Sequence, residues 1–220
     1  RFGELPETSV PATNVNRYIT RIASEFIIPE LGPQLLVFWH TDPDRTQHAG
    51  GPGTPEALTA LREADANLGA ILESLDAAGT RSRTVVAVVS DHGFATNIGT
   101  IDIEARLADS GVLESVDNWA QVVSGFVYFD HPDQAFEAHV VDALMAIPEV
   151  GGIFTRHAIN GTFPLGTAGA VGPDGPDILY GLTWDDAENA SGVSGRAWSH
   201  PMRGAGNHGS FSPFEGHNTA

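Results

Sequence analysis

Residues 35–48 read LLVFWHTDPDRTQH, and this stretch gives the first indication of a fold class. Its first five residues are a continuous apolar run, which indicates a buried parallel strand. A polar loop, residues 40–53, follows at once. Residues 84–90 read TVVAVVS and predict a second buried strand, which is again followed directly by polar residues, DHGF at 91–94.

A long helix is predicted between these two strands. Thr54 suits the N-cap, Pro55 suits the first helical position, and Gly79 is a typical stop. The predicted apolar stripe consists of leucines at helical spacing: Leu58, Leu61, Leu68, Leu72 and Leu75. A strand, a helix and a strand in this order indicate a βαβ crossover. Ligands gather at the carboxyl ends of such strands, where both polar loops are expected to lie.

The remaining chain predicts further helices and strands in mixed order. Helical spacing occurs within residues 14–30, 102–110 and 134–147, and strands are expected at 122–129, 153–156 and 178–184. Residues 185–210 are rich in Gly and Ser and have few apolar anchors. We therefore expect an α/β protein with one domain over residues 1–220 and a smaller α+β subregion at about 112–184.

The composition excludes several classes of protein. Apolar residues make up 41% and charged residues 18%, as in ordinary globular domains. The formal net charge is −17, which argues against a nucleic-acid surface and against attraction to anionic membranes. No apolar run is long enough to span a membrane. Because cysteine is absent, any metal ion must be bound by His, Asp, Glu or water.

Potential metal ligands occur in three separate loops. Asp44 and His48 are four residues apart, Asp91 and His92 are adjacent, and His208 lies between Asn207 and Gly209. Each group alone is weak evidence, because polar residues at strand ends often only form turns. Together they offer five nitrogen and oxygen donors of the kind that zinc binds. The alternative is an acidic α/β domain whose loop side chains merely pair with one another.

Three blocks of the sequence resemble the nucleotide pyrophosphatase/phosphodiesterase branch of the alkaline phosphatase superfamily. They are DPDRTQH at 42–48 with the long helix after it, VVSDHGF at 88–94, and NHGSFSP at 207–213. The resemblance covers roughly residues 14–220. It implies a mostly parallel central sheet flanked by helices, with a smaller α+β insertion.

The resemblance also implies two divalent metal ions, most simply Zn²⁺. Asp44, His48 and His208 would hold one ion, and Asp91 and His92 would belong to the other. The family's Thr or Ser nucleophile and a further aspartate lie in none of the matched blocks. We therefore expect a catalytic domain truncated at both ends, whose sheet is completed by a missing N-terminal segment or a partner chain. Without that segment or partner chain, some apolar surface of the sheet would be exposed to solvent.

Four further residues are candidates for supporting roles around the ions. His40 ends the first predicted strand and is a candidate to orient a ligand. Asp42 is a candidate to support His48. Phe94 follows a metal loop and would either stack on a nucleobase or pack against its neighbours. Arg203 is a candidate to contact phosphate oxygens.

The function that the resemblance implies is metal-dependent hydrolysis of phosphate esters. A phosphodiesterase or nucleotide pyrophosphatase acting on a nucleotide or another small phosphate ester fits best. The alternatives are a phosphomonoesterase, phosphonate hydrolase, sulfatase or phosphomutase of the same superfamily, or a catalytically inactive metal-binding fragment. The resemblance alone favours an extracytoplasmic location, periplasmic or secreted.

Overall fold

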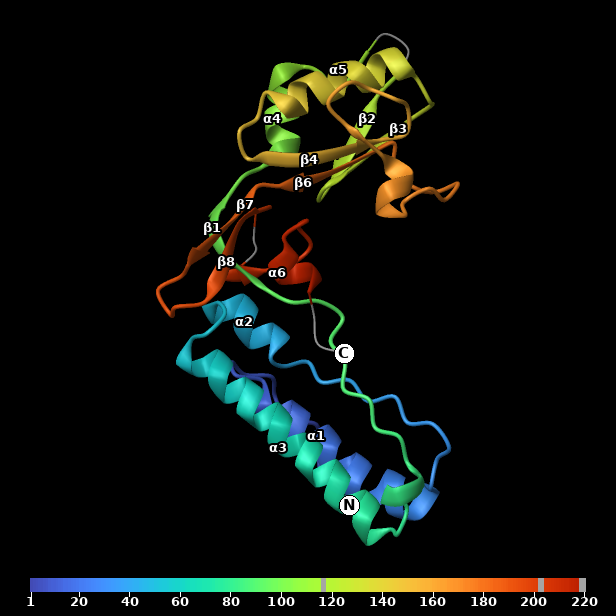
Figure 1. Ribbon diagram of the computed structural model, residues 1–220, viewed down its shortest axis with the longest axis vertical. Coiled ribbons are helices and arrows are strands. Elements are labelled where there is room, and N and C mark those ends of the chain that lie inside the picture. Colours follow the sequence, from blue (N-terminus) through green and yellow to red (C-terminus); the bar gives the residue numbers. More distant parts are fainter. Residues whose placement is uncertain (116–117, 202–203, 218–220) are drawn as a thin grey trace.

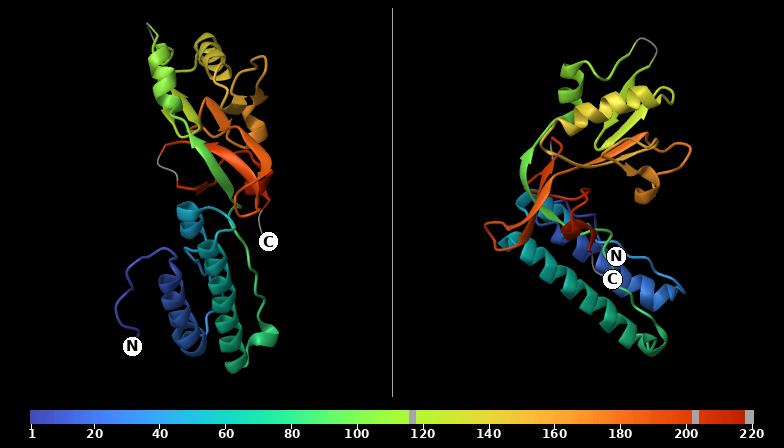
Figure 2. Two further views of the ribbon diagram at one scale, coloured as in Figure 1. Left: turned by 90° about the vertical axis from the view of Figure 1, so that its left-hand side faces the viewer. Right: turned by 45° about the horizontal axis from the view of Figure 1, so that its top comes forward.

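The computed structural model describes residues 1–115, 118–201 and 204–217. Figure 1 shows three parts along the long axis of the molecule: a pair of helices, a four-stranded sheet, and a five-stranded sheet with two helices over it. In the views of Figure 2, the helical pair again lies at one end and the larger sheet at the other.

The helical pair consists of the N-terminal helix and the long helix. Helix α1 (Thr13–Ile22) continues directly into the π-helix η1 (Ala23–Leu31), and both pack against α3 (Pro55–Ala77). The prediction for the start of α3 is confirmed, because the Thr54 hydroxyl accepts a hydrogen bond from the Ala57 N–H and Pro55 opens the helix.

The predicted leucine stripe of α3 is only partly correct. Leu75 is buried, but Leu58 and Leu61 are 41% and 47% exposed. The buried positions in this half of the helix are Ala57 and Ala60, which are fully covered. Alanine side chains are short and let neighbouring elements approach closely, so the buried face is the one with the smaller residues.

The four-stranded sheet has the order β7-β8-β1-β9. Its strands are β1 (Ala95–Thr100), β7 (Trp184–Glu188), β8 (Ser194–Ser199) and β9 (Gly206–Asn207). Strands β1 and β8 pair in parallel, and the other pairs are antiparallel. Strands β8 and β9 and most of β7 lie in the Gly- and Ser-rich residues 185–210, where the sequence predicted no strand. The hydrophobic pattern that would have predicted strand β8 is weak, because its buried positions are the small residues Gly195, Ala197 and Ser199.

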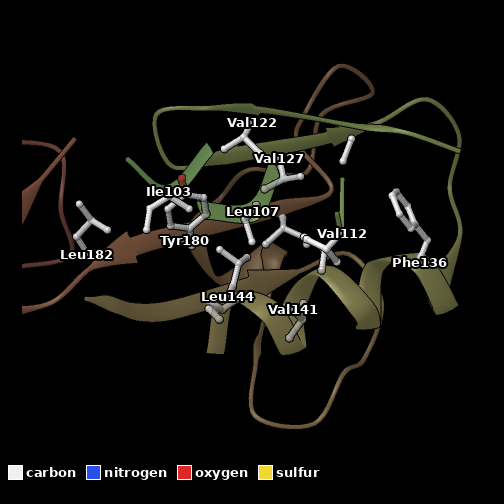
Figure 3. Packing of buried hydrophobic residues seen from close by; sticks show 14 of the residues in the cluster. Ile103, Leu107, Val112, Val122, Val127, Phe136, Val141, Leu144, Tyr180 and Leu182 are labelled. Carbon is white, nitrogen blue, oxygen red and sulfur yellow. The ribbon is translucent and has the colours of Figure 1, made fainter. Parts of the chain in front are cut away.

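The five-stranded sheet contains the main hydrophobic core. Its order is β2 (Ala120–Val123), β3 (Phe126–Phe129), β6 (Ile178–Leu182), β4 (Val150–Thr155) and β5 (Phe163–Pro164). Helices α4 (Ile103–Ser110) and α5 (Gln134–Met145), both predicted, pack onto it. Figure 3 shows Leu107, Val127 and Leu144 meeting in this core, and each is at most 1% exposed. Ser124 and Gly125, with φ of 42° and 97°, turn the expected single strand at 122–129 into a hairpin.

The two strands expected at 35–39 and 84–90 do not form. Among the described residues, neither segment pairs with a strand, and Figure 1 shows both as extended coil between the far end of the helical pair and the sheets. Leu35, Val37 and Val85 are 80%, 81% and 95% exposed. A strand that is apolar on both faces is stable only between other strands and under covering helices, and the described chain supplies neither here.

The architecture is a mixed α/β fold whose sheets are flanked by helices, as expected. The expectation of a mostly parallel sheet is wrong for the described strands, where only the pairs β1–β8 and β4–β5 are parallel, because the two apolar segments expected to form parallel strands lie outside both sheets. A division near residues 112 and 184 stays a prediction, although the five-stranded sheet lies within Ala120–Leu182. The remaining helical turns are η2 (Arg81–Arg83), η3 (Leu165–Ala168), α2 (Asp44–Gly50) and α6 (Pro213–Gly216). In the described part of the chain, no helix is both long and apolar enough to cross a membrane.

Candidate metal centre

The first polar loop is partly helical. Residues 44–50 form the short helix α2, so the expectation of a loop throughout 40–53 is wrong. The Asp42 carboxylate lies just before the N-cap residue Pro43 and supports the first turn of the helix, because it accepts hydrogen bonds from the Thr46 N–H at 2.9 Å and the Thr46 hydroxyl at 2.8 Å. Asp44 and His48 are therefore one helical turn apart and lie on the same face.

Asp42 also connects α2 to the N-terminal helix. Its side chain is fully buried and accepts a hydrogen bond from the backbone N–H of Ala12. The buried Asn16 side chain of α1 donates to the Asp42 carbonyl at 3.0 Å and accepts from the Thr41 N–H at 3.0 Å. These bonds fix the chain immediately before Asp44.

Three of the predicted ligands meet in one cluster. The ligand atoms of Asp44, His48 and His208 all lie within 4.8 Å of one another. The Nε2 atoms of His48 and His208 are each 3.6 Å from Asp44 Oδ1 and are 3.2 Å from each other. Residues that are 160 positions apart in the chain, His48 and His208, are thus neighbours.

The loop with Asp91 and His92 joins the same cluster. His92 Nε2 lies 3.8 Å from Asp44 Oδ1 and 3.4 Å from Asp91 Oδ2. The imidazole ring of His92 stacks on that of His208, with centroids 3.5 Å apart and 17° between the planes. Side chains from three distant segments therefore face one another, and they are accessible: Asp91 is 51% exposed and His92 is 23% exposed.

Two imidazoles are oriented by backbone carbonyls. His48 Nδ1 lies 3.0 Å from the Gly206 carbonyl oxygen, and His92 Nδ1 lies 2.9 Å from the Gly93 carbonyl oxygen. Since a carbonyl oxygen only accepts, each Nδ1 carries the hydrogen, and each Nε2 of the neutral ring presents a lone pair. This donor set, imidazole Nε2 with carboxylate oxygen, fits a divalent ion such as zinc.

The surroundings also keep one imidazole neutral. Burial lowers the pKa of His208, and the nearby imidazoles of His92 and His48 lower it further, against smaller opposite effects of Asp44 and Asp91. A neutral imidazole is the form that binds a metal ion. The pKa shift therefore favours the metal-binding form of His208 at neutral pH.

Two glycines bring β9 close to α2, and sequence reasoning missed both. A Cβ on Gly204 would lie 1.8 Å from the His48 carbonyl oxygen, and one on Gly206 would lie 2.5 Å from the Gln47 carbonyl oxygen. Between them, the Ala205 N–H donates to the His48 carbonyl at 2.8 Å. The only signal in the sequence is the spacing of glycines just before His208.

The other residues proposed for supporting roles around the ions are His40, Arg203 and Phe94. His40 Nε2 lies 3.2 Å from the Thr20 hydroxyl of α1, and burial lowers the pKa of this histidine. Arg203 lies outside the described residues. The Phe94 ring packs against three imidazoles, at centroid distances of 4.9, 5.6 and 5.3 Å from His48, His92 and His208 respectively.

Known proteins with the same fold include a murine enzyme. The structure of murine ectonucleotide pyrophosphatase/phosphodiesterase 5 is similar with a TM-score of 0.57 and 19% sequence identity, over 87% of this chain and 48% of that chain. The structure of an inactive variant of the murine protein in complex with AMP matches with the same values. This chain thus spans about half the length of these relatives. No curated protein sequence matches significantly.

The sequence itself matches a family of phosphate-ester hydrolases. The family profile described as type I phosphodiesterase/nucleotide pyrophosphatase matches residues 10–173, which is well over half of the chain. Family and fold agree, since both are those of phosphodiesterase and pyrophosphatase hydrolases. This chain therefore belongs to the type I phosphodiesterase/nucleotide pyrophosphatase family.

Proposed function

We propose that the chain supplies the metal-binding part of a phosphodiesterase or nucleotide pyrophosphatase that works with two zinc ions. The observation that carries the proposal is the approach of Asp44, His48 and His208 to within 4.8 Å of one another. Asp44 and His48 share one helix face, whereas His208 follows β9. In this proposal these three residues hold one ion, and Asp91 and His92 contribute to the other.

The charge of the protein makes metal ions necessary for this chemistry. The chain has a formal net charge of −17, and two carboxylates, Asp44 and Asp91, lie at the site. A phosphate ester is itself an anion and would be repelled. Divalent ions, when bound, reverse the local charge, lower the pKa of a coordinated hydroxyl and stabilise charge on phosphoryl oxygens.

The chain's own residues have separate tasks in this proposal. The carbonyls of Gly206 and Gly93 hold the Nδ1 protons of His48 and His92, so that both Nε2 lone pairs stay available. Phe94 packs against the imidazoles and limits how far they can move. The Thr or Ser nucleophile is proposed to come from a segment outside this chain, because no matched block contains it.

Metal analysis tests the site. After dialysis against zinc and then against buffer, the chain should retain zinc by mass spectrometry, and Asp44→Asn should lower the affinity by more than the roughly 10- to 100-fold that loss of an outer-shell partner costs. Asp76→Asn, an exposed aspartate in α3, is the matched control and should bind like the parent. A folded parent chain that retains no zinc would overturn the proposal.

The substrate class needs a separate test with the full-length protein. A nucleotide or another phosphate diester is proposed, with support from the AMP complex of the murine relative. Hydrolysis of bis-p-nitrophenyl phosphate, p-nitrophenyl phosphate and p-nitrophenyl sulfate should be compared at equal concentration. The diester should react fastest. Faster cleavage of the monoester or sulfate would instead favour another branch of the superfamily, and no cleavage would favour an inactive metal-binding protein.

We also propose that another segment or a partner chain covers residues 35–39 and 84–90. The support is the exposure of their apolar side chains, with Val37 81% and Val85 95% exposed. Exposed apolar surface of this kind marks an interaction site. Light scattering should detect association of the chain at micromolar concentration. A monomeric chain that does not bind a dye for exposed apolar surface would contradict the proposal.

An extracytoplasmic location is the last part of the proposal. Its support is the family membership and the murine relative, which is an ectoenzyme by name. Fractionation of cells that express the full-length protein should place it in the periplasm or medium. Recovery in the cytoplasm alone would contradict this.

A further inference from the structure

The short helix α6 contains a buried acidic residue beside the candidate metal centre. Glu215 is 4% exposed, and its carboxylate accepts hydrogen bonds from the Ser210 N–H and the Ser210 hydroxyl, both at 2.7 Å. Burial raises the pKa of Glu215, whereas the hydrogen bonds from Ser210 and from the backbone of Gly209 oppose that shift. Ser210, two residues after His208, therefore donates both of its hydrogen bonds to the Glu215 carboxylate.

The backbone of the same helix contacts the second metal loop. The Glu215 carbonyl oxygen accepts a hydrogen bond from the Gly93 N–H at 2.7 Å. The approach is close enough that a Cβ on Gly93 would lie 2.2 Å from the Phe214 carbonyl oxygen. Glu215 thus bonds to the loop with Asp91 and His92 through its main chain, and to the loop with His208 through its side chain.

These contacts relate two imidazoles that come from different parts of the chain. His92 immediately precedes Gly93, and His208 lies two residues before Ser210. Their rings stack at 3.5 Å, and both Nε2 atoms approach Asp44 Oδ1. We infer that Glu215 is a positioning residue, which holds the His208 loop in register with the Asp91–His92 loop so that both can bind metal. This inference rests on the proposed metal-binding function.

Holding the His208 loop in this way requires a side chain with two acceptor oxygens, which a carboxylate has. Ser210 presents two donors, an N–H and an O–H, and the two oxygens of Glu215 accept one each. A glutamine in the same place has one acceptor oxygen and an NH₂ group that only donates. Glu215→Gln keeps the size of the side chain and removes one of the two bonds, and Ser210→Ala removes the hydroxyl bond from the other side.

Zinc binding and a spectroscopic probe test the inference. Glu215→Gln should lower zinc affinity by about 10- to 100-fold, as the loss of an outer-shell contact does, and should change the visible absorption spectrum of bound Co²⁺. Ser210→Ala should weaken zinc binding in the same direction, and the double variant should be no weaker than Glu215→Gln alone. The control is Glu188→Gln, at an exposed position of β7, which should leave both affinity and spectrum unchanged.

Taken together, the outcomes distinguish failure of the proposed zinc binding from failure of the positioning role of Glu215. If the parent binds no zinc, the proposed function and this inference both fail. If the parent binds zinc and a folded Glu215→Gln variant has the parent's affinity and Co²⁺ spectrum, only the positioning role is overturned. Should Glu215→Gln not fold, Ser210→Ala decides alone: parent-like affinity and spectrum in that variant would overturn the inference.

Discussion

The imidazole rings of His92 and His208 are stacked, with centroids 3.5 Å apart and planes 17° from parallel. They come from residues 116 positions apart in the sequence, and both Nε2 atoms point to the same oxygen of Asp44, at 3.8 and 3.6 Å. The two Nε2 atoms therefore lie on the same side of the stacked pair. The two rings therefore lie in one cluster of side chains, although they are proposed to serve different ions.

The two stacked histidines should differ in their effect on zinc retention. His208 belongs to the compact group with Asp44 and His48, whereas His92 is expected to serve a second ion. After exhaustive dialysis the chain should keep one zinc ion. His208→Ala should release it, and His92→Ala should largely preserve it. His139→Ala, an exposed histidine of α5, is the control. Equal losses in both site variants would contradict separate roles.

Replacing Gly204 by alanine should weaken zinc binding. An added methyl group would lie 1.8 Å from the His48 carbonyl oxygen, so Gly204→Ala must displace either α2 or the segment that leads to His208. Zinc affinity, measured by isothermal titration, should fall at least about 10-fold. Gly69→Ala is the matched control, because nothing lies near its Cβ position and alanine favours a helix by roughly 0.5–1 kcal/mol. Unchanged affinity in Gly204→Ala would mean that α2 and β9 can separate freely.

Asp42 should stabilise the fold and the site together. Asp42→Ala leaves the N–H groups of Ala12 and Thr46 without their acceptor in a buried place, and each such loss costs about 1–3 kcal/mol. Urea denaturation should report this loss, and zinc affinity should fall because the first turn of α2 loses its hydrogen bonds to Asp42. Asp42→Asn retains one acceptor oxygen and should recover part of the stability. Equal stability of the alanine variant and the parent would show that water replaces the carboxylate.

His40 should make stability depend on pH. Burial lowers its pKa below 6.5, so below pH 6.5 the unfolded chain binds more protons than the folded chain. The contribution of His40 to stability is therefore present above pH 6.5 and is lost as the pH falls through the window below it. Between pH 7.5 and 5.5, the parent should lose more stability than His40→Gln in metal-free urea titrations. His139→Gln should behave as the parent does, and identical pH profiles for parent and His40→Gln would contradict the expectation.

The sequence alone identified the family and the residues of interest. The block at 42–48, the block at 88–94 and the block at 207–213 have residue types and an order that local chemistry restricts, and such patterns can be read without coordinates. Local signals also predicted α3 and its Thr54 cap, because caps depend on neighbours in the chain. These predictions needed no information about contacts between distant residues.

Only the tertiary structure decided which distant groups touch. Strand β8 is buried through Gly195, Ala197 and Ser199, whose burial depends on what covers them and not on their own hydrophobicity. The apolar segments at 35–39 and 84–90 look like strands, yet they lack strand partners in the described chain. Glu215 has no local motif, and its contacts to Gly93 and Ser210 exist only after the chain has folded. Residue types are a property of the sequence, but pairing and burial depend on long-range packing.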